Sequence, residues 1–597
     1  MKKNSKFPFF DTIRRVMKET YKGDNTIFKL CFLFTIVSCI YPFCGIFLPK
    51  TILSILSRNS NKIIYEVSIC VASFFLIMAV TNFIKVYIAN TIYVRFTKLR
   101  IIYIKERFQK ISNIAYHYLE ESSFFDENEK AIDSTNGRGK GIDGVYNKLF
   151  ELPSIILITL ILLILISRQN IIITIIIICQ MAIQLYVTQV NRNFQFSKNQ
   201  EIVHTHRRVR HYFKTTYDFR YGKDIRLFKL KDRLLCNYDH EIDEYVKQQD
   251  QVYDHEFKFS FLPLITNMIF NPAIYAFLIY GTFKGLDMDV FVMYILVISE
   301  LDNYLKQLAE NIIVLTTESQ YVSEFYRFID SDMEEIENVK QNSNVKDADI
   351  TFQNVSFKYP FTDNYVLQKF SLKINKGEKI AIVGSNGTGK STVTKLLMGL
   401  YTSYDGKITI NGQDIKWMKR KDLFRKFSVV FQDFNIYAFT VVENIATGCE
   451  NMDQDRVSQV LEEIDMNEFV NQLPNKMNHP LLKMIDDGAE LSGGQMQKIA
   501  IARALYKDAD IVVLDEPTAS FDAIAEQKIY TNMAQLAKNK TVLFISHRLA
   551  STQFCDRIIL LNENGICEVG THEKLMSKKG EYYKMYRLQG KYYQEDV

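Results

Sequence analysis

The stretch GSNGTGKS at 384–391 is a glycine-rich loop that ends in a lysine and a hydroxyl group, and it fits the pattern G-x-x-x-x-G-K-[ST]. Glycines in such a loop let backbone N–H groups curl around phosphate oxygens, and a following helix points the positive end of its dipole at the same anion. We expect Lys390 to meet the β- and γ-phosphates of a nucleotide, and Ser391 to meet Mg²⁺. The alternative is a glycine turn that binds nothing. It is disfavoured because a strand-like run, KIAIV, precedes the loop and a helix-like run, STVTKLLMGL, follows it.

The run IVVLDE at 511–516 has the pattern of a buried strand and ends in two carboxylates. Asp515 is suited to hold Mg²⁺ through water, and Glu516 is suited to polarise an attacking water molecule. Together with the glycine loop, these residues predict the hydrolysis of a nucleotide.

A second glycine motif, LSGGQMQK at 491–498, lies far along the chain from the first. The two motifs could build one site together. They could also be two half-sites, each of which needs another copy of the chain. The spacing alone leaves both arrangements open.

The second half of the chain has the pattern of a soluble α/β domain. The run ITFQNVSFKYP, which starts at Ile350, alternates like a half-buried strand, and Asn411-Gly412 is a hairpin signal. Before it, an acidic and polar stretch has the composition of a linker. We therefore predict an N-terminal arm at 1–25, a membrane domain at 26–329, a linker at 330–349 and a nucleotide-binding domain at 350–597.

The first half carries apolar runs of the length that crosses a bilayer as a helix. We expect six spans, at about 27–49, 65–90, 149–167, 170–190, 260–281 and 288–315. The sixth span is the least apolar, because Glu300, Asp302 and Lys306 follow its apolar start. The connections at 91–148 and 191–259 are rich in helix formers and charge, so we expect the membrane helices to continue far beyond the bilayer.

The distribution of charge predicts that both termini are cytoplasmic. The N-terminal arm and the stretches 95–110 and 207–233 are rich in lysine and arginine, which favours the cytoplasmic side of a membrane. The net charge of +5 is modest, and aromatic and basic residues do not interleave, so we expect no nucleic-acid partner. The predicted location is the cytoplasmic membrane, crossed several times, with lipids around the spans.

The motifs GSNGTGKS, LSGGQ and IVVLDE, with the later SHR at 546–548, resemble the nucleotide-binding domain of ABC transporters. Six spans ahead of such a domain look like an exporter-type half-transporter. The fold class that this resemblance implies is a multi-domain membrane protein, with an all-α six-helix transmembrane domain like that of type I ABC exporters, followed by an α/β P-loop ATPase domain. It also implies an answer to the question of the two glycine motifs. Ser492 and Gly494 would close on the γ-phosphate of ATP held by Lys390 of a partner domain.

Further roles implied by the family fall on single residues. Tyr359 is expected to stack on adenine, Gln432 to link Mg²⁺ and water to the membrane half, and His547 to hold the γ-phosphate. Taken alone, Tyr359 could be a strand-end aromatic and His547 a capping residue. Asp522 occupies the position of an aspartate that crosses the dimer, although the residues beside it depart from the usual pattern.

The predicted catalytic residues are Glu516, His547 and Gln432, and the predicted metal ligands are Ser391, Gln432 and Asp515. The residues expected to bind the nucleotide are Tyr359, Gly384, Ser385, Asn386, Gly387, Thr388, Gly389, Lys390, Ser391, Thr392, Ser492, Gly493, Gly494, Gln495 and Asp522. The implied cofactors are ATP and Mg²⁺.

The resemblance implies an ATP hydrolase that drives export by alternating access, paired with a second copy of itself or with a related half-transporter. The expected cargo is a peptide of the bacteriocin or lantibiotic kind. The stretch DDGAELSGGQMQKIAIARAL and the abundance of isoleucine, lysine and asparagine look similar to peptide exporters of low-GC Gram-positive bacteria. Export of lipids or drugs is an alternative, and an ATP-gated regulator or channel is an alternative of another class.

Glu300 and Asp302 are the best clue to the cargo. Acidic residues within a membrane span are tolerated where they face a wet cavity, and there they would favour a cationic peptide. The alternative is that the helix already emerges among the headgroups of the inner leaflet at this point.

Two stretches midway along the cytoplasmic connections mix aromatic and charged residues. They are ESSFFDENEKA at 121–131 and FRYGKDIRLFKL at 219–230. We expect each to form a short transverse helix that rests on a nucleotide-binding domain, because aromatic residues amid charge suit a helix docked in a groove. An ordinary solvated turn is the alternative.

Overall fold

The computed structural model divides the chain into two compact units by its internal contacts. The first unit is Met1–Asn113 with Ser122–Asp332, and the second is Ile114–Glu121 with Met333–Val597. The residues described are 9–58, 62–137, 139–168, 171–218, 221–285, 287–334, 349–360, 362–448, 451–483, 488–516, 540–547, 549–552, 555–563 and 565–591. The four-part division drawn from the sequence stays a prediction, and most of its linker lies outside these residues.

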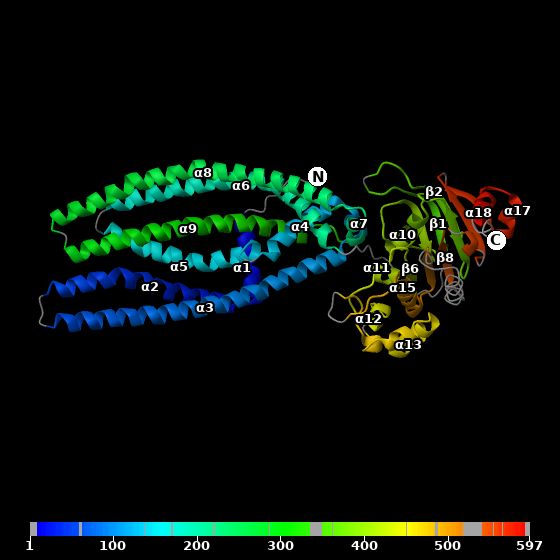
Figure 1. The fold of residues 1–597 in the computed structure, drawn as a ribbon, viewed down its shortest axis with the longest axis horizontal. Helices are drawn as coiled ribbons and strands as arrows, with labels where there is room; N and C mark the ends of the chain where they lie inside the picture. The colour runs from blue at the N-terminus through cyan, green and yellow to red at the C-terminus, as the bar shows by residue number, and fades with distance from the viewer. Residues whose placement is uncertain are drawn as a thin grey trace. The chain divides into compact units, whose positions relative to one another are not determined.

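The first unit is helical (Figure 1). Its helices are α1 (Phe9–Gly23), α2 (Thr26–Leu56), α3 (Ile63–Asn113), α4 (Ser122–Asn136), α5 (Gly141–Ser167), α6 (Ile171–Tyr217), α7 (Gly222–Leu227), α8 (Lys231–Phe283) and α9 (Met288–Ile329). Helices α3, α6, α8 and α9 are far longer than a bilayer requires. This confirms that the apolar runs continue as helices into the polar connections.

The long helices of the first unit pack in pairs. Helix α2 lies along α3, α5 along α9, and α6 along α8. Among the described residues, five helices are long and apolar enough to cross a membrane, namely α2, α3, α5, α6 and α8. Helix α9 does not meet that criterion, in keeping with the charged residues predicted to make the sixth span the least apolar. Buried Ile158, Leu162, Val297 and Leu301 form part of the apolar core between α5 and α9.

The second unit contains two sheets (Figure 1). The four-stranded sheet has the order β2-β1-β4-β5, and the six-stranded sheet has the order β10-β9-β3-β8-β7-β6. The strands are β1 (Ile350–Phe357), β2 (Leu367–Ile374), β3 (Lys379–Gly384), β4 (Asp405–Ile410), β5 (Gln413–Asp414), β6 (Phe427–Val430), β7 (Ile511–Asp515), β8 (Thr541–Ile545), β9 (Arg557–Asn562) and β10 (Gly565–Gly570). Strand β1 confirms the alternating run at Ile350. The hairpin signal is confirmed too, because Ile410 pairs with Gln413 across Asn411-Gly412, and both turn residues have positive φ, as a two-residue turn of this kind requires.

Helices and short turns connect these strands. They are α10 (Lys390–Leu397), α11 (Arg420–Arg425), α12 (Val441–Ile445), α13 (Gln454–Glu463), α14 (Asn467–Gln472), α15 (Gly493–Lys507), α17 (His572–Lys578) and α18 (Glu581–Lys591), with the 3₁₀ turns η3 (Ile415–Trp417), η4 (Lys476–Asn478) and η5 (Leu549–Thr552).

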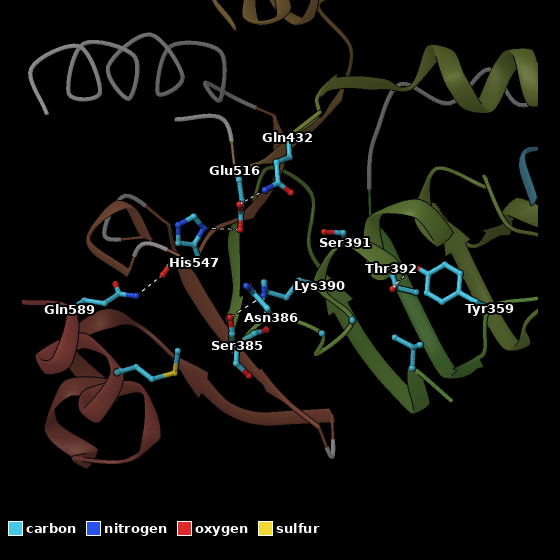
Figure 2. A pocket seen from close by; sticks show the side chains of 15 residues that line it. Tyr359, Ser385, Asn386, Lys390, Ser391, Thr392, Gln432, Glu516, His547 and Gln589 are labelled. Carbon is cyan, nitrogen blue, oxygen red and sulfur yellow. Dashed lines mark hydrogen bonds and ion pairs between the residues drawn. The ribbon is translucent and has the colours of Figure 1, made fainter. Parts of the chain in front are cut away.

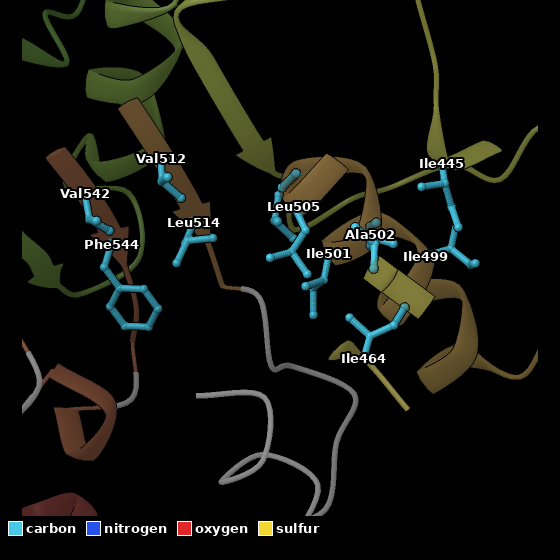
Figure 3. Packing of buried hydrophobic residues seen from close by; sticks show 14 of the residues in the cluster. Ile445, Ile464, Ile499, Ile501, Ala502, Leu505, Val512, Leu514, Val542 and Phe544 are labelled. Carbon is cyan, nitrogen blue, oxygen red and sulfur yellow. The ribbon is translucent and has the colours of Figure 1, made fainter. Parts of the chain in front are cut away.

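Both faces of the six-stranded sheet are buried. Successive residues of its central strands point to opposite sides, and each side is covered by other elements. On one face, Val512, Leu514 and Phe544 face helix α15, where Ile501 and Leu505 meet them (Figure 3). On the other face, alternate residues of the same strands pack with α10 and with the four-stranded sheet. A sheet covered in this way is held rigidly, and its strand ends are the fixed points of the domain.

A piece of the first cytoplasmic connection belongs to the second unit. The 3₁₀ turn η1 (Tyr116–Glu120) lies between α3 and α4 in the sequence but packs with the second unit. The backbone N–H of Ala115 donates to Met333 O at 3.0 Å. The stretch predicted to rest on this domain, 121–131, lies mostly in α4, which packs on α9 in the first unit. The prediction that 121–131 rests on a nucleotide-binding domain stays a prediction.

Candidate functional site

The candidate site lies at the carboxyl ends of adjacent parallel strands. Strands β3, β8, β7 and β6 are neighbours and run in the same direction. Each is followed by one element of the site: the glycine loop after β3, Gln432 after β6, Glu516 after β7 and His547 after β8. Ligands of open α/β sheets bind at this edge. A cavity of about 820 Å³ opens there, lined by all four elements (Figure 2).

The glycine loop has the backbone that its sequence demands. Gly387 has φ 86° and Gly389, the residue before α10, has φ 89°. A Cβ built on Gly384 would lie 2.3 Å from Leu561 O of the neighbouring strand. Only glycine fits this close approach, and the loop is therefore held against β9. Backbone N–H groups of a loop of this kind suit an anion.

Lys390 is the buried cation of the site. Its Nζ donates to two carbonyls of its own loop, Gly384 O at 2.9 Å and Ser385 O at 2.7 Å. Burial lowers the pKa of Lys390 below its ordinary value, and the nearby charges of Glu516 and Asp515 oppose that shift. An ammonium with three donors can keep these two bonds and offer the third to phosphate.

Glu516 is fixed between two nitrogen donors. Gln432 Nε2 donates to one carboxylate oxygen at 2.8 Å, and His547 Nδ1 lies 2.8 Å from the other (Figure 2). The Glu516 backbone has φ 47°, a conformation that costs free energy for a residue with a side chain. Its N–H donates to Ile545 O at 3.0 Å, which holds the turn in place. The strained turn aims this carboxylate at the end of the glycine loop.

Asp515 and Ser391 fit a Mg²⁺ site. The Ser391 hydroxyl bonds to the Asp515 carboxyl, and burial, the main cause, raises the pKa of Asp515 to about 6. Among the described residues, the buried Oδ1 of Asp515 has no hydrogen-bond partner. A buried acceptor left without a donor is costly, and a hard cation is the partner that such an oxygen prefers. Gln432, the third predicted ligand, lines the same cavity.

Tyr359 lines the cavity beside α10, where its hydroxyl lies 2.9 Å from Thr392 Oγ1. Its ring packs edge-on against Tyr401. The Lys395 ammonium lies 5.7 Å from the Tyr359 ring centroid and 3.6 Å from Glu120 Oε1. Tyr401 donates its hydroxyl to Glu120, and Tyr116 packs edge-on against Tyr401. The turn η1 is thus anchored to the aromatic cluster that ends at the cavity.

The second glycine motif begins α15 and lies outside this cavity as lined by the described residues. Ser492 caps the helix: Gln495 N donates to its hydroxyl at 3.3 Å, and the Ser492 N–H donates to Gln495 Oε1 at 2.8 Å. A Cβ built on Gly493 would have no heavy atom within 4 Å. The helix start is therefore well formed and open.

Arg503 connects α15 with the segment that carries Gln432. Its guanidinium donates to Asn444 O at 2.6 Å, to Asn435 O at 2.7 Å and to Asn444 Oδ1 at 2.9 Å. Asn444 is fully buried and donates in turn to three carbonyls of the same segment, among them Tyr437 O. Movement of either element therefore disturbs the other.

The structure brings most of the predicted site residues together. The cavity is lined by Tyr359, Gly384, Ser385, Asn386, Gly387, Gly389, Lys390, Ser391, Thr392, Gln432, Glu516 and His547. Thr388 lies within the same loop, and Asp515 contacts Ser391. Ser492, Gly493, Gly494 and Gln495 are elsewhere on the domain, and Asp522 lies outside the described residues.

Three lining residues were missed, namely Val366, Met585 and Gln589. Met585 and Gln589 lie on α18, after the last strand. The only sequence signal for them is the helical spacing of Tyr582, Met585, Tyr586 and Gln589, which predicts one packed face but not what that face contacts.

Comparison with known proteins agrees with this geometry. Residues 367–519 match the family described as ABC transporter. Over the whole chain, a solved structure of a bacterial Atm1-family ABC exporter with ATP bound superimposes with a TM-score of 0.74 at 22% identity, covering 96% of this chain and 98% of the other. The matched domain, and the order of a helical unit followed by an α/β unit, are thus similar to those of exporter-type half-transporters of the ABC class.

Two groups of curated relatives are similar in sequence. The subtilin transport ATP-binding protein SpaT of Bacillus subtilis is 33% identical over 373 residues, which are 62% of this chain and 61% of that protein. An ATP-dependent lipid A-core flippase of Methylobacillus flagellatus is 36% identical over 265 residues, 44% of this chain and 45% of that protein. The chain thus spans about three fifths of the first relative and under half of the second. Further relatives come from other bacteria and from Arabidopsis thaliana, so the matches do not support a Gram-positive source.

Replacing Gly384 by alanine should weaken ATP binding by roughly tenfold or more, because the new Cβ would meet Leu561 O and push the loop out of shape. Titration of the purified full-length chain with a fluorescent ATP analogue measures this. The matched control is Gly45→Ala in α2, where the added Cβ also meets open space and ATP binding should be unchanged. Equal affinity in the Gly384 variant would contradict the assignment of this loop.

Proposed function

We propose that the chain hydrolyses ATP to drive export across the cytoplasmic membrane, working as a pair of half-transporters. The observation that carries the proposal is Glu516, held between Gln432 and His547 at the strand edge where the glycine loop ends. The same chain supplies helices long and apolar enough to cross a membrane. Together these are the parts of an ATP-driven pump.

Each residue of the site has a separate role in the proposed hydrolysis. The loop N–H groups and Lys390 hold the phosphates in place. Glu516, aimed at the end of the loop, takes the proton of the attacking water, and His547 binds the γ-phosphate from the side of β8. Gln432 orients the same water through its bond to Glu516. Such positioning in a fixed site is the main source of rate in phosphoryl transfer.

Mg²⁺ would be held by Ser391 and Asp515, with the amide oxygen of Gln432 as a third group. When bound, the ion neutralises charge that develops on the phosphates. The orphaned Oδ1 of Asp515 supports this assignment.

The second copy of the chain supplies the remaining half of the site. The open start of α15 presents backbone N–H groups and the positive end of a helix dipole, which suit a γ-phosphate. They are not among the described residues that line the cavity at the strand ends of their own chain. We therefore assign Ser492, Gly493, Gly494 and Gln495 to the nucleotide of a partner, in a homodimer or with a related half-transporter. Asp522 is assigned to the dimer contact from its sequence position alone.

Closure of the paired domains would reach the membrane helices along the chain itself. Within the domain, Arg503 links α15 to the segment that carries Gln432 and Asn444. The turn η1 is anchored by Glu120 to Tyr401, and along the chain it lies between the end of α3 and the start of α4. Closure would thereby switch the spans from inward-open to outward-open.

A peptide is the better-supported cargo. The alignment with the subtilin transport protein covers 373 residues, more than the stretch from Ile350 to Val597 holds, so it must include part of the membrane half. The lipid A-core flippase alignments are close to the length of the nucleotide-binding domain, which is similar in transporters of many substrates. Lipid export is the second candidate, on the strength of those relatives.

Polar side chains from three helices support a hydrophilic cargo. Buried Gln180 on α6 donates to Asn267 on α8 at 2.5 Å. Asp302 on α9 lines a small cavity with Gln180 and Asn271, and its Oδ2 lies 2.6 Å from Lys306 Nζ. Polar groups within a membrane span are costly in lipid unless they face one another or a wet cavity. A cationic peptide could take the place of Lys306 beside Asp302.

Replacing Glu516 by glutamine should lower ATP hydrolysis by about a hundredfold or more while ATP still binds, because the amide cannot accept the proton of water. Phosphate release and nucleotide binding by the purified protein in lipid measure the two effects. Glu468→Gln, on the exposed surface of α14, is the matched control. Hydrolysis near the wild-type rate would show that another group is the base.

Replacing Gly493 by aspartate should abolish hydrolysis, yet leave folding and ATP binding by the same chain intact. An acidic residue in the first turn favours the helix itself, whereas it would repel the γ-phosphate brought by a partner. Thermal unfolding, analogue binding and phosphate release separate the three effects. Gly493→Ala is the uncharged control, and the assignment fails if the aspartate variant hydrolyses ATP normally.

Changing Glu300 and Asp302 together to their amides should reduce the stimulation of ATPase activity by a lysine-rich peptide several-fold, because the attraction for its ammonium groups is removed. The same peptide is tested on Glu310→Gln, which alters an exposed carboxylate farther along α9. Unchanged stimulation in the double variant would remove the proposed cationic preference.

Accumulation of peptide inside inverted vesicles, against its gradient, separates a pump from an ATP-gated channel. Uptake that stops with Glu516→Gln supports export. ATP-dependent leakage down the gradient, without accumulation, would favour the channel.

A further inference from the structure

We propose that Gln589 is the positioning residue for His547, so that the last helix, α18, holds the turn after β8 in its working geometry. The proposal rests on the function assigned above, because it concerns the same hydrolytic site. It adds a residue from a part of the chain that carries none of the recognised motifs.

The carboxamide of Gln589 makes two bonds to the turn at once. Its Nε2 donates to His547 O at 2.6 Å, and Leu549 N donates to its Oε1 at 2.9 Å. Leu549 is the first residue of η5, where a helical N–H has no partner inside its own helix. One side chain therefore replaces the backbone partner that this turn would otherwise lack.

The bonds of Gln589 decide where the imidazole points. His547 is held at its backbone carbonyl by α18 and at its ring Nδ1 by Glu516 on the other side (Figure 2). A carbonyl released from Gln589 would let the peptide plane rotate, and the ring would turn away from Glu516 with it. Active-site groups displaced by about 1 Å lose large factors in rate.

Helix α18 is itself firmly anchored to the region that it positions. Tyr582 is fully buried, and its hydroxyl lies 3.3 Å from Thr552 Oγ1 at the end of η5 and 2.9 Å from His572 Nδ1. Residues 582, 585, 586 and 589 share one face of the helix, and Met585 and Tyr586 pack against the apolar core. Gln589 thus reaches the turn from a face that is fixed two turns earlier. Leu588, on the opposite side, is 61% exposed.

The test compares Gln589→Ala with Leu588→Ala in the full-length protein in lipid. Loss of the two bonds should lower kcat for ATP hydrolysis by about ten- to a hundredfold and change KM for ATP by less than about threefold, because the glycine loop and Tyr359 still bind the nucleotide. Gln589→Glu should be at least as impaired, since a carboxylate would face the His547 carbonyl. Leu588→Ala should behave like the wild type. A normal kcat in Gln589→Ala would overturn the proposal.

Two further measurements separate positioning from a general loss of structure. Amide hydrogen exchange of the peptide that contains Leu549 should accelerate in Gln589→Ala, while exchange in β3 and α10 stays unchanged. In single-turnover hydrolysis, adding Gln589→Ala to His547→Ala should cause no further loss, because the effect passes through the imidazole. Additive losses, or faster exchange throughout the domain, would show a structural role and overturn the proposal. The exchange measurement needs no ATPase activity, so it tests the two hydrogen bonds of Gln589 even if the proposed hydrolysis fails.

Discussion

The parallel pairing of four buried strands is the constraint on which the rest of the structure depends. Strands β3, β8, β7 and β6 end at one edge, and every group that we propose to be catalytic follows one of those ends. Because both faces of the sheet are packed with apolar side chains, the ends cannot shift independently. The sheet thereby places the glycine loop, Gln432, Glu516 and His547 around one cavity, although they are far apart in the sequence.

Because the sheet and α15 are held in fixed positions, one chain by itself supplies only half of each proposed site. The start of α15 is capped by its own Ser492 and Gln495, and it lies away from the cavity that the strand ends enclose. An exposed helix start is a good site for an anion, and this one is not among the described residues that line the cavity. Pairing of two copies would satisfy both halves at once, and this would make hydrolysis depend on assembly. The hydrogen bonds of Arg503 would then transmit a movement of α15, caused by binding of the partner, to the segment that carries Gln432.

Features that depend on local sequence could be predicted. The glycine loop, strand β1, the turn at Asn411-Gly412 and the long helices of the first unit all follow from spacing and polarity over a few residues. Features that depend on distant partners could not. Glu120 in η1 and Gln589 in α18 look like ordinary surface residues, and only the fold shows that one meets Tyr401 and the other meets the turn of His547.

The most direct measurement of the composite site is to mix two inactive chains, Lys390→Ala and Gly493→Asp, which carry different purification tags. Each variant alone disables both sites of its own pair. A mixed pair regains one intact site, made from the unaltered glycine loop of one chain and the unaltered α15 start of the other. The account predicts that co-purified mixed pairs recover hydrolysis. Because roughly half of the pairs in a random mixture are mixed, and each of these has one intact site of two, the whole mixture should reach up to roughly a quarter of the wild-type rate. Mixed pairs that form but stay inactive, or either variant hydrolysing ATP normally by itself, would contradict it.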